Sequence, residues 1–192
     1  MAETLRAYGI KMLMAESHRQ ILLTRIPEGG NFFEWGSGGT SLWLCDNLPE
    51  RSIMASVESD KEWFNKINAI RSARPTMTAR WNYELAGDDS WIRGKNAHPH
   101  EETPAGLEQY ICRREATDAD VILVDGVARG ACLAWALSVC KPYATIFLHD
   151  AGRNWYAWAV TLAEYQGWKT TMIPFMPGEY PAQLMMIEKK SQ

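Results

Sequence analysis

Two acidic residues lie on either side of a glycine-rich turn, in an order that suits a site for a nucleotide. Glu34 stands inside Phe33-Glu34-Trp35-Gly36-Ser37-Gly38-Gly39, at the end of a short apolar run. The glycines of this segment lack a Cβ atom, so the turn can adopt positive φ and a ligand can approach its backbone closely. Glu58 follows the next apolar run, Ile53–Val57, roughly 20 residues beyond the glycines, where an acid can accept hydrogen bonds from both hydroxyls of a ribose. This order predicts a nucleotide-binding βαβ unit.

A second group of polar residues follows two further apolar runs and offers the best candidates for chemistry. Asp125 ends the run that begins at Asp120, and His149 and Asp150 follow the run 144–148. Parallel strands end at one edge of a sheet, where ligands bind in this kind of architecture. An ordinary histidine pKa suits removal of a proton from a hydroxyl near neutral pH. His149 is therefore either a general base or a strand-end residue that hydrogen-bonds to the backbone.

Two arginines follow the same two runs. Arg129 and Arg153 could hold a carboxylate or phosphate of a substrate at the mouth of the crevice. Equally, they could pair with Asp125 and Asp150 in a structural network of ion pairs. The aromatic residues Trp155, Tyr156 and Trp158 have the spacing of a helix face, which favours core packing or an interface over stacking on a substrate.

The elements that position these residues alternate between strand and helix. Apolar runs predict strands near Phe32 and Phe33, and at 53–57, 78–81, 120–125, 144–148, 170–173 and 183–187. Helices are expected after Thr40 or Ser41, at 61–70, at 131–140 and at 156–167. Only a short loop, 174–182, joins the last two strands, so these must be antiparallel. The sequence thus predicts an α/β fold: a Rossmann-like, doubly wound, mostly parallel seven-stranded sheet with a C-terminal antiparallel hairpin and helices on both faces.

Two further segments flank or interrupt this alternation within what we expect to be a single domain, residues 1–192. Residues 1–27 have the spacing of amphipathic helices and are expected to form a helical flank or lid. Residues 87–117 form a long polar loop that could close over a substrate. It contains His98-Pro99-His100-Glu101-Glu102, which we interpret as a solvated loop because it lacks helical spacing of metal ligands.

Composition narrows the partners. The net charge is −3 with scattered basic residues, so nucleic acid is not expected as a partner. No apolar run is long enough to cross a bilayer, and the first residues lack a secretory pattern, so we expect a cytoplasmic protein that does not bind membranes. The four cysteines have no Cys-x-x-Cys spacing and are expected to be free thiols. Nine tryptophans make a homo-oligomer plausible.

The motifs together resemble one family. Glu34-Trp35-Gly36-Ser37-Gly38-Gly39, the acid Glu58 and the terminal hairpin are similar to those of the class I S-adenosylmethionine-dependent methyltransferases, over nearly the whole chain. With Leu123-Val124-Asp125-Gly126 and His149-Asp150-Ala151-Gly152-Arg153, the sequence resembles a little-characterised bacterial branch of that family.

The resemblance implies S-adenosylmethionine as cofactor. It assigns Glu34 to the amino group of the methionine moiety, the backbone of Gly36, Ser37 and Gly38 to the same part of the ligand, and Glu58 to the ribose. The adenine pocket would follow the third strand, where Asp88 could accept from the adenine amine and Trp91 could stack. Metal-dependent relatives hold magnesium on two aspartates and an asparagine. Asp125 and Asp150 match the aspartates, but Ala151 replaces the asparagine, so the resemblance leaves magnesium doubtful.

The leading hypothesis is methyl transfer from S-adenosylmethionine to a small-molecule acceptor, at oxygen or nitrogen. Under it His149, Asp150 and Asp125 are catalytic, Asp125 also faces the cofactor, and Arg129 and Arg153 bind substrate. A dinucleotide-binding (NAD) oxidoreductase is the first alternative, because the glycines approximate the G-x-G-x-x-G pattern. A non-catalytic S-adenosylmethionine-binding module is the second, since a fold alone does not establish activity.

Overall fold

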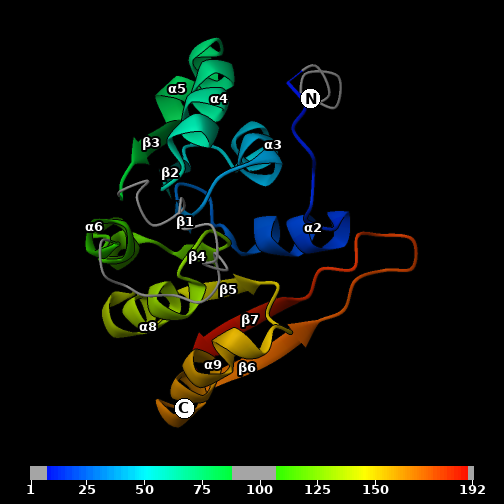
Figure 1. Ribbon diagram of the computed structural model, residues 1–192, viewed down its shortest axis with the longest axis vertical. Helices are drawn as coiled ribbons and strands as arrows, with labels where there is room; N and C mark the ends of the chain where they lie inside the picture. Colours follow the sequence, from blue (N-terminus) through cyan, green and yellow to red (C-terminus); the bar gives the residue numbers. More distant parts are fainter. Residues whose placement is uncertain (1–7, 88–106, 190–192) are drawn as a thin grey trace, which may run out of the picture.

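The computed structural model describes residues 8–87 and 107–189. Its strands form one seven-stranded sheet in the order β3-β2-β1-β4-β5-β7-β6 (Figure 1). The strands are β1 (Asn31–Trp35), β2 (Ile53–Glu58), β3 (Trp81–Leu85), β4 (Val121–Val124), β5 (Thr145–His149), β6 (Trp168–Ile173) and β7 (Leu184–Lys189). The first five are parallel, whereas β7 runs antiparallel to both β5 and β6. The predicted fold class and terminal hairpin are therefore confirmed, with β7 inserted between β5 and the edge strand β6.

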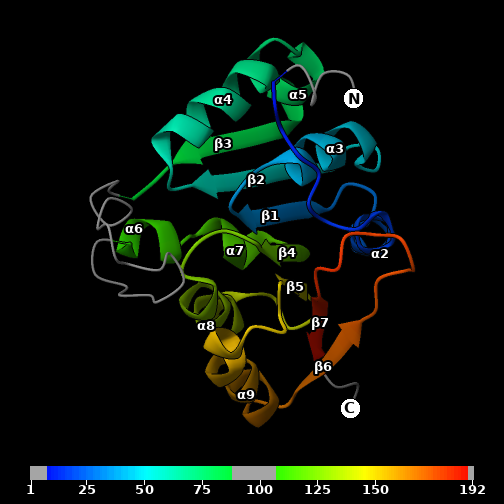
Figure 2. The same ribbon diagram turned by 45° about the vertical axis from the view of Figure 1, so that its right-hand side comes forward.

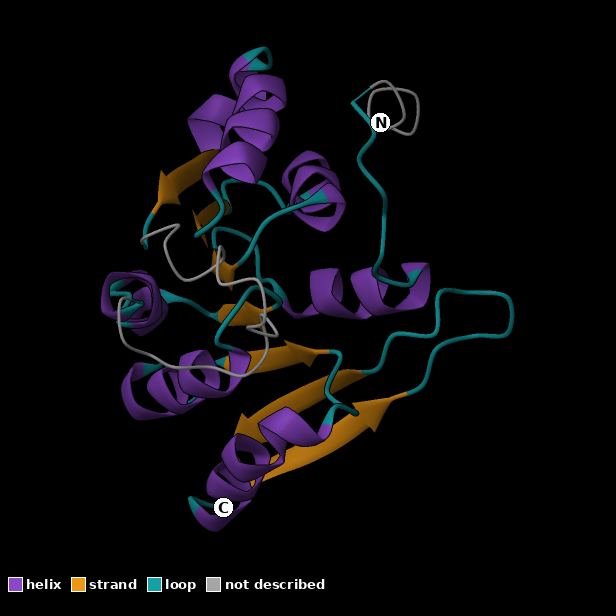
Figure 3. Ribbon diagram, in the orientation of Figure 1, coloured by secondary structure: helices purple, strands orange, loops and turns teal. Residues whose placement is uncertain are grey.

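Helices pack on both faces of the sheet (Figures 2 and 3). The helices are α2 (Glu16–Arg25), α3 (Gly39–Asn47), α4 (Lys61–Ser72), α5 (Pro75–Arg80), α6 (Glu108–Ile111), α7 (Glu115–Asp118), α8 (Arg129–Val139) and α9 (Ala157–Tyr165), with a 3₁₀ turn at Asn154–Tyr156. Neighbouring strand residues point to opposite faces. Phe33 and Trp35 join the core with α8 and α9, while Phe32 joins the core with α2, α3 and α4.

The strand order explains where the site must lie. After β1 the chain builds β2 and β3 on one side of β1, and it then returns to place β4 on the other side of β1. Such a reversal opens a crevice beyond the carboxyl ends of the two central strands. Trp35 of β1 pairs with Val57 of β2 and with Val124 of β4, so the residues after these strands meet at one edge.

Two expectations in the middle of the chain need correction. The strand expected at 78–81 is instead the end of α5, which begins at Pro75, and β3 starts at Trp81. Proline suits a first helical turn because its missing N–H is not needed there. The expected loop 87–117 contains two short helices, α6 and α7, while residues 88–106 lie outside the described part.

At the N-terminus, only Glu16–Arg25 of the expected helical flank is helical among its described residues, and residues 8–15 form a non-helical segment. Of the aromatic group after β5, Tyr156 is buried, but Trp155 and Trp158 are about half exposed. All four cysteines are free, as expected. Within residues 8–87 and 107–189, no helix is long and apolar enough to cross a membrane.

Candidate functional site

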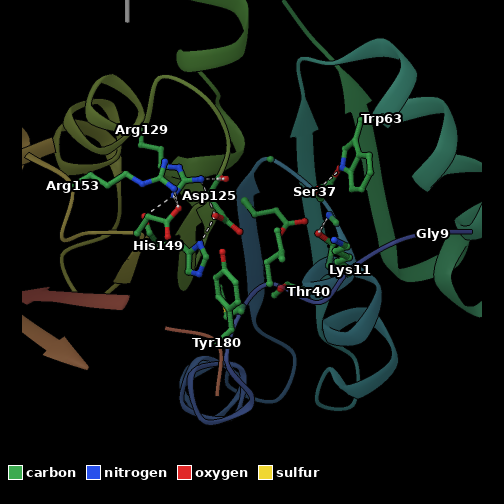
Figure 4. A pocket seen from close by; sticks show the side chains of 18 residues that line it. Gly9, Lys11, Ser37, Thr40, Trp63, Asp125, Arg129, His149, Arg153 and Tyr180 are labelled. Carbon is green, nitrogen blue, oxygen red and sulfur yellow. Dashed lines mark hydrogen bonds and ion pairs between the residues drawn. The ribbon is translucent and has the colours of Figure 1, made fainter. Parts of the chain in front are cut away.

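A cavity of about 480 Å³ opens at the carboxyl ends of the central strands (Figure 4). Its walls come from the glycine turn after β1, the ends of β4 and β5, the N-terminal segment, Trp63 of α4, and Tyr180 of the β6–β7 loop. Most of the predicted site residues line it: Glu34, Gly36, Ser37, Gly38, Asp125, Arg129, His149, Asp150 and Arg153. The tertiary structure therefore brings the two groups of sequence-predicted residues into one cavity.

Glu34 is a buried carboxyl group at the floor of this cavity. Its Oε1 atom accepts a hydrogen bond from Ser56 Oγ at 2.7 Å, and Ser56 Oγ in turn accepts from Trp81 Nε1 at 2.6 Å. Burial raises the pKa of Glu34 from 4.5 to about 8, and hydrogen bonds from Ser41 and Ser56 offset this only in part. A buried carboxyl group with a raised pKa favours a cationic ligand, because a nearby positive charge stabilises its ionised form.

The glycine turn depends on the absence of a side chain at Gly36. This residue has φ +87°, and a Cβ atom there would lie 2.6 Å from Gly126 Cα. The turn is fixed further by Trp63, whose Nε1 donates to the Ser37 carbonyl at 2.6 Å. Because α3 begins at Gly39, Ser41 lies inside the first helical turn, and its Oγ accepts from the Gly38 N–H at 2.9 Å. The first-turn residues Gly39, Thr40 and Ser41 line the cavity, and the first N–H groups of a helix have no acceptor within the helix, so a ligand carboxylate can bind there.

Glu58 lies at the end of β2 but does not line the cavity. Its Oε2 accepts from the N–H and the hydroxyl of Ser37 at 3.2 and 3.0 Å. Its Oε1 accepts from the backbone N–H groups of Ser59 and Asp60 at 2.8 and 3.0 Å. Burial raises its pKa in spite of these bonds. Glu58 therefore supports the glycine turn, and its assignment to a ribose stays a prediction.

His149 and Asp125 form a hydrogen-bonded pair. His149 Nδ1 lies 2.7 Å from Asp125 Oδ1, and the Nε2 atom is buried without a partner among the described residues. Burial alone would lower the pKa of His149, but the charge and hydrogen bond of Asp125 outweigh it and raise that pKa above 6.5. Burial likewise opposes ionisation of Asp125, but His149 and Arg129 keep its pKa below 3.8. The contact fixes Nδ1 as the donor in the neutral ring, which leaves a lone pair on Nε2.

Arg129 is the centre of a buried network. Its Nε donates to the Gly126 carbonyl at 2.8 Å, and Nη1 donates to the His149 carbonyl at 2.7 Å. Nη1 also contacts Asp150 Oδ2 at 3.1 Å, and Nη2 contacts the carbonyl and Oδ1 of Asp125 at 2.9 and 3.2 Å. Every nitrogen of this guanidinium is engaged. For Arg129 the geometry fits the ion-pair alternative raised by the sequence.

Arg153 and Asp150 complete the network. The Arg153 Nη2 atom lies 2.7 Å from the same Asp150 oxygen that Arg129 contacts, and the Arg153 side chain is 37% exposed. Asp150 reaches this position through a left-handed backbone, φ 54°. Asp125 and Asp150 do not fit a shared magnesium site, because the Arg129 guanidinium bridges them. Within the described residues, no group of three acidic, histidine or cysteine side chains is arranged for a metal ion.

Two predicted residues, Asp88 and Trp91, and the motif at 98–102 lie outside the described residues.

The sequence analysis missed two elements that line the cavity. Lys11 belongs to the non-helical N-terminal segment, whose backbone crosses α3 so closely that a Cβ at Gly39 would lie 2.9 Å from the Lys11 carbonyl oxygen. Tyr180 belongs to the loop between β6 and β7. The length of that loop was the available signal, since hairpin loops usually contain two to five residues.

Comparisons with known proteins agree on the fold. No protein-family model matches the sequence, and no curated protein matches it. Among solved structures, the chain shares the Rossmann-like fold of S-adenosylmethionine-dependent methyltransferases. A precorrin-6y C5,15-methyltransferase from Geobacter metallireducens is 16% identical, with a TM-score of 0.63 over 94% of this chain and 92% of that chain.

Two O-methyltransferase structures are similar to a comparable degree. TomG from Streptomyces achromogenes, in complex with SAM, is 14% identical, with a TM-score of 0.62 over 98% of this chain and 87% of its own. An O-methyltransferase from Bacillus cereus, in complex with SAH, has the same identity and TM-score over 98% of this chain and 88% of its own. At such identities, the likeness establishes the fold, and function must be argued from the site.

Proposed function

We propose that this protein is an S-adenosylmethionine-dependent methyltransferase that acts on a small-molecule acceptor, at oxygen or nitrogen. The observation that carries the proposal is the buried Glu34 carboxyl group beside the glycine turn, at the reversal of strand order. A carboxylate there suits the amino group of the cofactor, and the α3 amides suit its carboxylate. The solved methyltransferases with the same fold support this choice.

The cofactor supplies, when bound, a methyl group that is already activated on a sulfonium sulfur. The protein has to orient the acceptor and, for a hydroxyl, accept its proton. In the proposed reaction, His149 Nε2 takes this proton, while Asp125 Oδ1 holds the ring through Nδ1 and stabilises the imidazolium that forms. Arg129 contacts both Asp125 and Asp150 and so holds the His149–Asp125 pair in position.

Calorimetric titration with S-adenosylhomocysteine tests the proposal, with NADH as the matched alternative. We expect one saturable site for S-adenosylhomocysteine, no dependence on magnesium, and no binding of NADH. Glu58→Ala should weaken binding of S-adenosylhomocysteine, because it removes the carboxylate that holds the Ser37 turn and that we assign to the ribose. Binding of NADH in place of S-adenosylhomocysteine would favour the oxidoreductase. Cofactor binding with no methyl transfer to any acceptor would favour a binding module.

A further inference from the structure

One end of the cavity is built from two segments that are distant in the sequence. Arg153 follows β5, and Tyr180 lies in the loop between β6 and β7. Figure 4 shows both side chains at the His149 end of the cavity, with Lys11 and Trp63 at the opposite end, beside the glycine turn. We call the end formed by His149, Arg153 and Tyr180 the acceptor subsite.

The loop that carries Tyr180 is anchored by the neighbouring carboxylate. Glu179 Oε1 accepts from the Ser17 N–H at 2.8 Å, and Oε2 accepts from the Ser17 hydroxyl at 2.5 Å and from the Met176 N–H at 2.7 Å. Ser17 lies in the first turn of α2, whose N–H groups have no partner within the helix. Bonds from Ser17 and Met176 hold the pKa of Glu179 at about 2, so this anchor persists at ordinary pH.

Tyr180 is placed to meet a ligand as well as the protein. Its side chain is half exposed although the adjacent Glu179 is anchored. In Figure 4 its hydroxyl points toward the pair formed by His149 and Asp125. An aromatic ring with one polar end can cover the flat apolar body of a ligand while its hydroxyl faces the reacting group.

Arg153 differs from Arg129 in its access to the cavity. The Arg129 side chain is 9% exposed and the Arg153 side chain 37%. Arg153 shares the Asp150 carboxylate with Arg129, and Arg129 also contacts Asp125. An exposed guanidinium at a cavity wall is well shaped to hold a carboxylate through paired N–H groups.

The charges of the cavity favour an anion. Cationic and acidic side chains line it in equal numbers: Lys11, Arg129 and Arg153 against Glu34, Asp125 and Asp150. Bound S-adenosylmethionine adds a net positive charge, because its sulfonium is not balanced by its own amino and carboxylate groups. An anionic acceptor would neutralise this excess, whereas a cationic acceptor would increase it.

From this arrangement we propose that the methyl acceptor is a hydroxylated aromatic acid, whose carboxylate binds Arg153, whose ring packs against Tyr180, and whose hydroxyl faces Nε2 of His149. This inference rests on the proposed methyl transfer and names the substrate class of the same site. It also separates the two arginines, because Arg153 binds substrate while Arg129 is structural.

The test uses two probes of nearly the same shape, 4-hydroxybenzoate and 4-hydroxybenzamide, of which only the first carries a carboxylate charge at neutral pH. Each is titrated by calorimetry into the full-length protein saturated with S-adenosylhomocysteine. We expect the benzoate to bind about tenfold more tightly or better, which is typical of a charge-assisted hydrogen bond. Arg153→Gln should abolish this preference and leave binding of the benzamide unchanged. Tyr180→Ala should weaken both probes to a similar degree.

Matched controls separate the subsite from general effects. Arg25→Gln removes an exposed arginine of α2 that pairs with Glu188 at 3.4 Å, outside the cavity, and should change nothing. Tyr165→Ala removes a tyrosine of α9 that is 90% exposed and should also be silent. Glu179→Ala should weaken both probes by releasing the loop, with S-adenosylhomocysteine still bound.

The possible failures are distinguishable. Equal binding of the two probes, binding of neither, or an unchanged preference in Arg153→Gln would overturn the assignment of an anionic acceptor, provided that S-adenosylhomocysteine binds. Failure of S-adenosylhomocysteine to bind the unmodified protein would overturn the proposed function itself.

Discussion

Glu34→Gln should stabilise the free protein at high pH and at the same time impair cofactor binding. The unmodified side chain is buried, accepts hydrogen bonds from Ser56 and Ser41, and has a pKa raised from 4.5 to about 8. Glutamine has the shape of the protonated acid and keeps an oxygen for Ser56, but it cannot ionise. The substitution therefore isolates the cost of the buried negative charge.

The sign follows from proton binding. Between pH 4.5 and about 8 the folded chain keeps a proton on Glu34 that the unfolded chain has lost, so stability falls as pH rises through this window and then levels off. With about 1.4 kcal/mol per pKa unit, the fall approaches about 5 kcal/mol as an upper value. Glu34→Gln removes this fall, so the two proteins should be alike near pH 5 and differ by several kcal/mol near pH 9.

The assay is urea unfolding of both proteins at a series of pH values, followed by calorimetry with S-adenosylhomocysteine. The variant should bind about ten- to a hundredfold more weakly, because a charge-assisted hydrogen bond is lost. In the unmodified protein, binding near neutral pH should release a proton as Glu34 ionises beside the ligand amino group. Parallel stability curves for the two proteins would refute the buried, neutral carboxyl group. Unchanged affinity would refute its assignment to the cofactor.

Three further variants test the framework. Gly36→Ala should lose several kcal/mol of stability, measured by urea unfolding, because φ +87° and the 2.6 Å approach to Gly126 leave no room for Cβ; ordinary stability would show that the turn can rearrange. Arg129→Met should cost about 1–3 kcal/mol in the same assay, because the buried His149 carbonyl and the partly buried Asp125 carboxylate lose their donor, and a loss well below about 1 kcal/mol would contradict the network. The NMR titration of His149 should give a pKa above 6.5. The protonated ring then adds stability below pH 6.5, and this stability is lost as pH rises through the folded pKa. Asp125→Asn should lower the pKa of His149, and an unchanged pKa would contradict the hydrogen-bonded pair.

Local sequence patterns predicted the structure correctly where a turn or a strand pairing depends on a few neighbouring residues. Glycines in a turn after an apolar run predicted the β1–α3 connection, and Gly36 does adopt positive φ. The short spacing between the last two strands required an antiparallel pair, which β6 and β7 form. Periodicity failed at 75–85, where Thr78–Trp81 resembles a strand. There a proline starts α5, and burial of Trp81 and Tyr83 in the core places the start of β3 at Trp81, three residues beyond the expected start at Thr78.

The sequence by itself determined that Glu34, Asp125 and His149 lie at the carboxyl ends of apolar strands. Because parallel strands end at one edge of a sheet, it also predicted that these three residues meet there. Only the tertiary structure decided what each arginine contacts, because the two arginines follow their strands at similar spacings but end in different surroundings, Arg129 buried and Arg153 exposed. Only the tertiary structure brought Lys11 and Tyr180 to the cavity. Local sequence specifies backbone turns and strand ends, whereas the contacts between segments more than a hundred residues apart depend on how the whole chain packs, as Ser17 and Glu179 show.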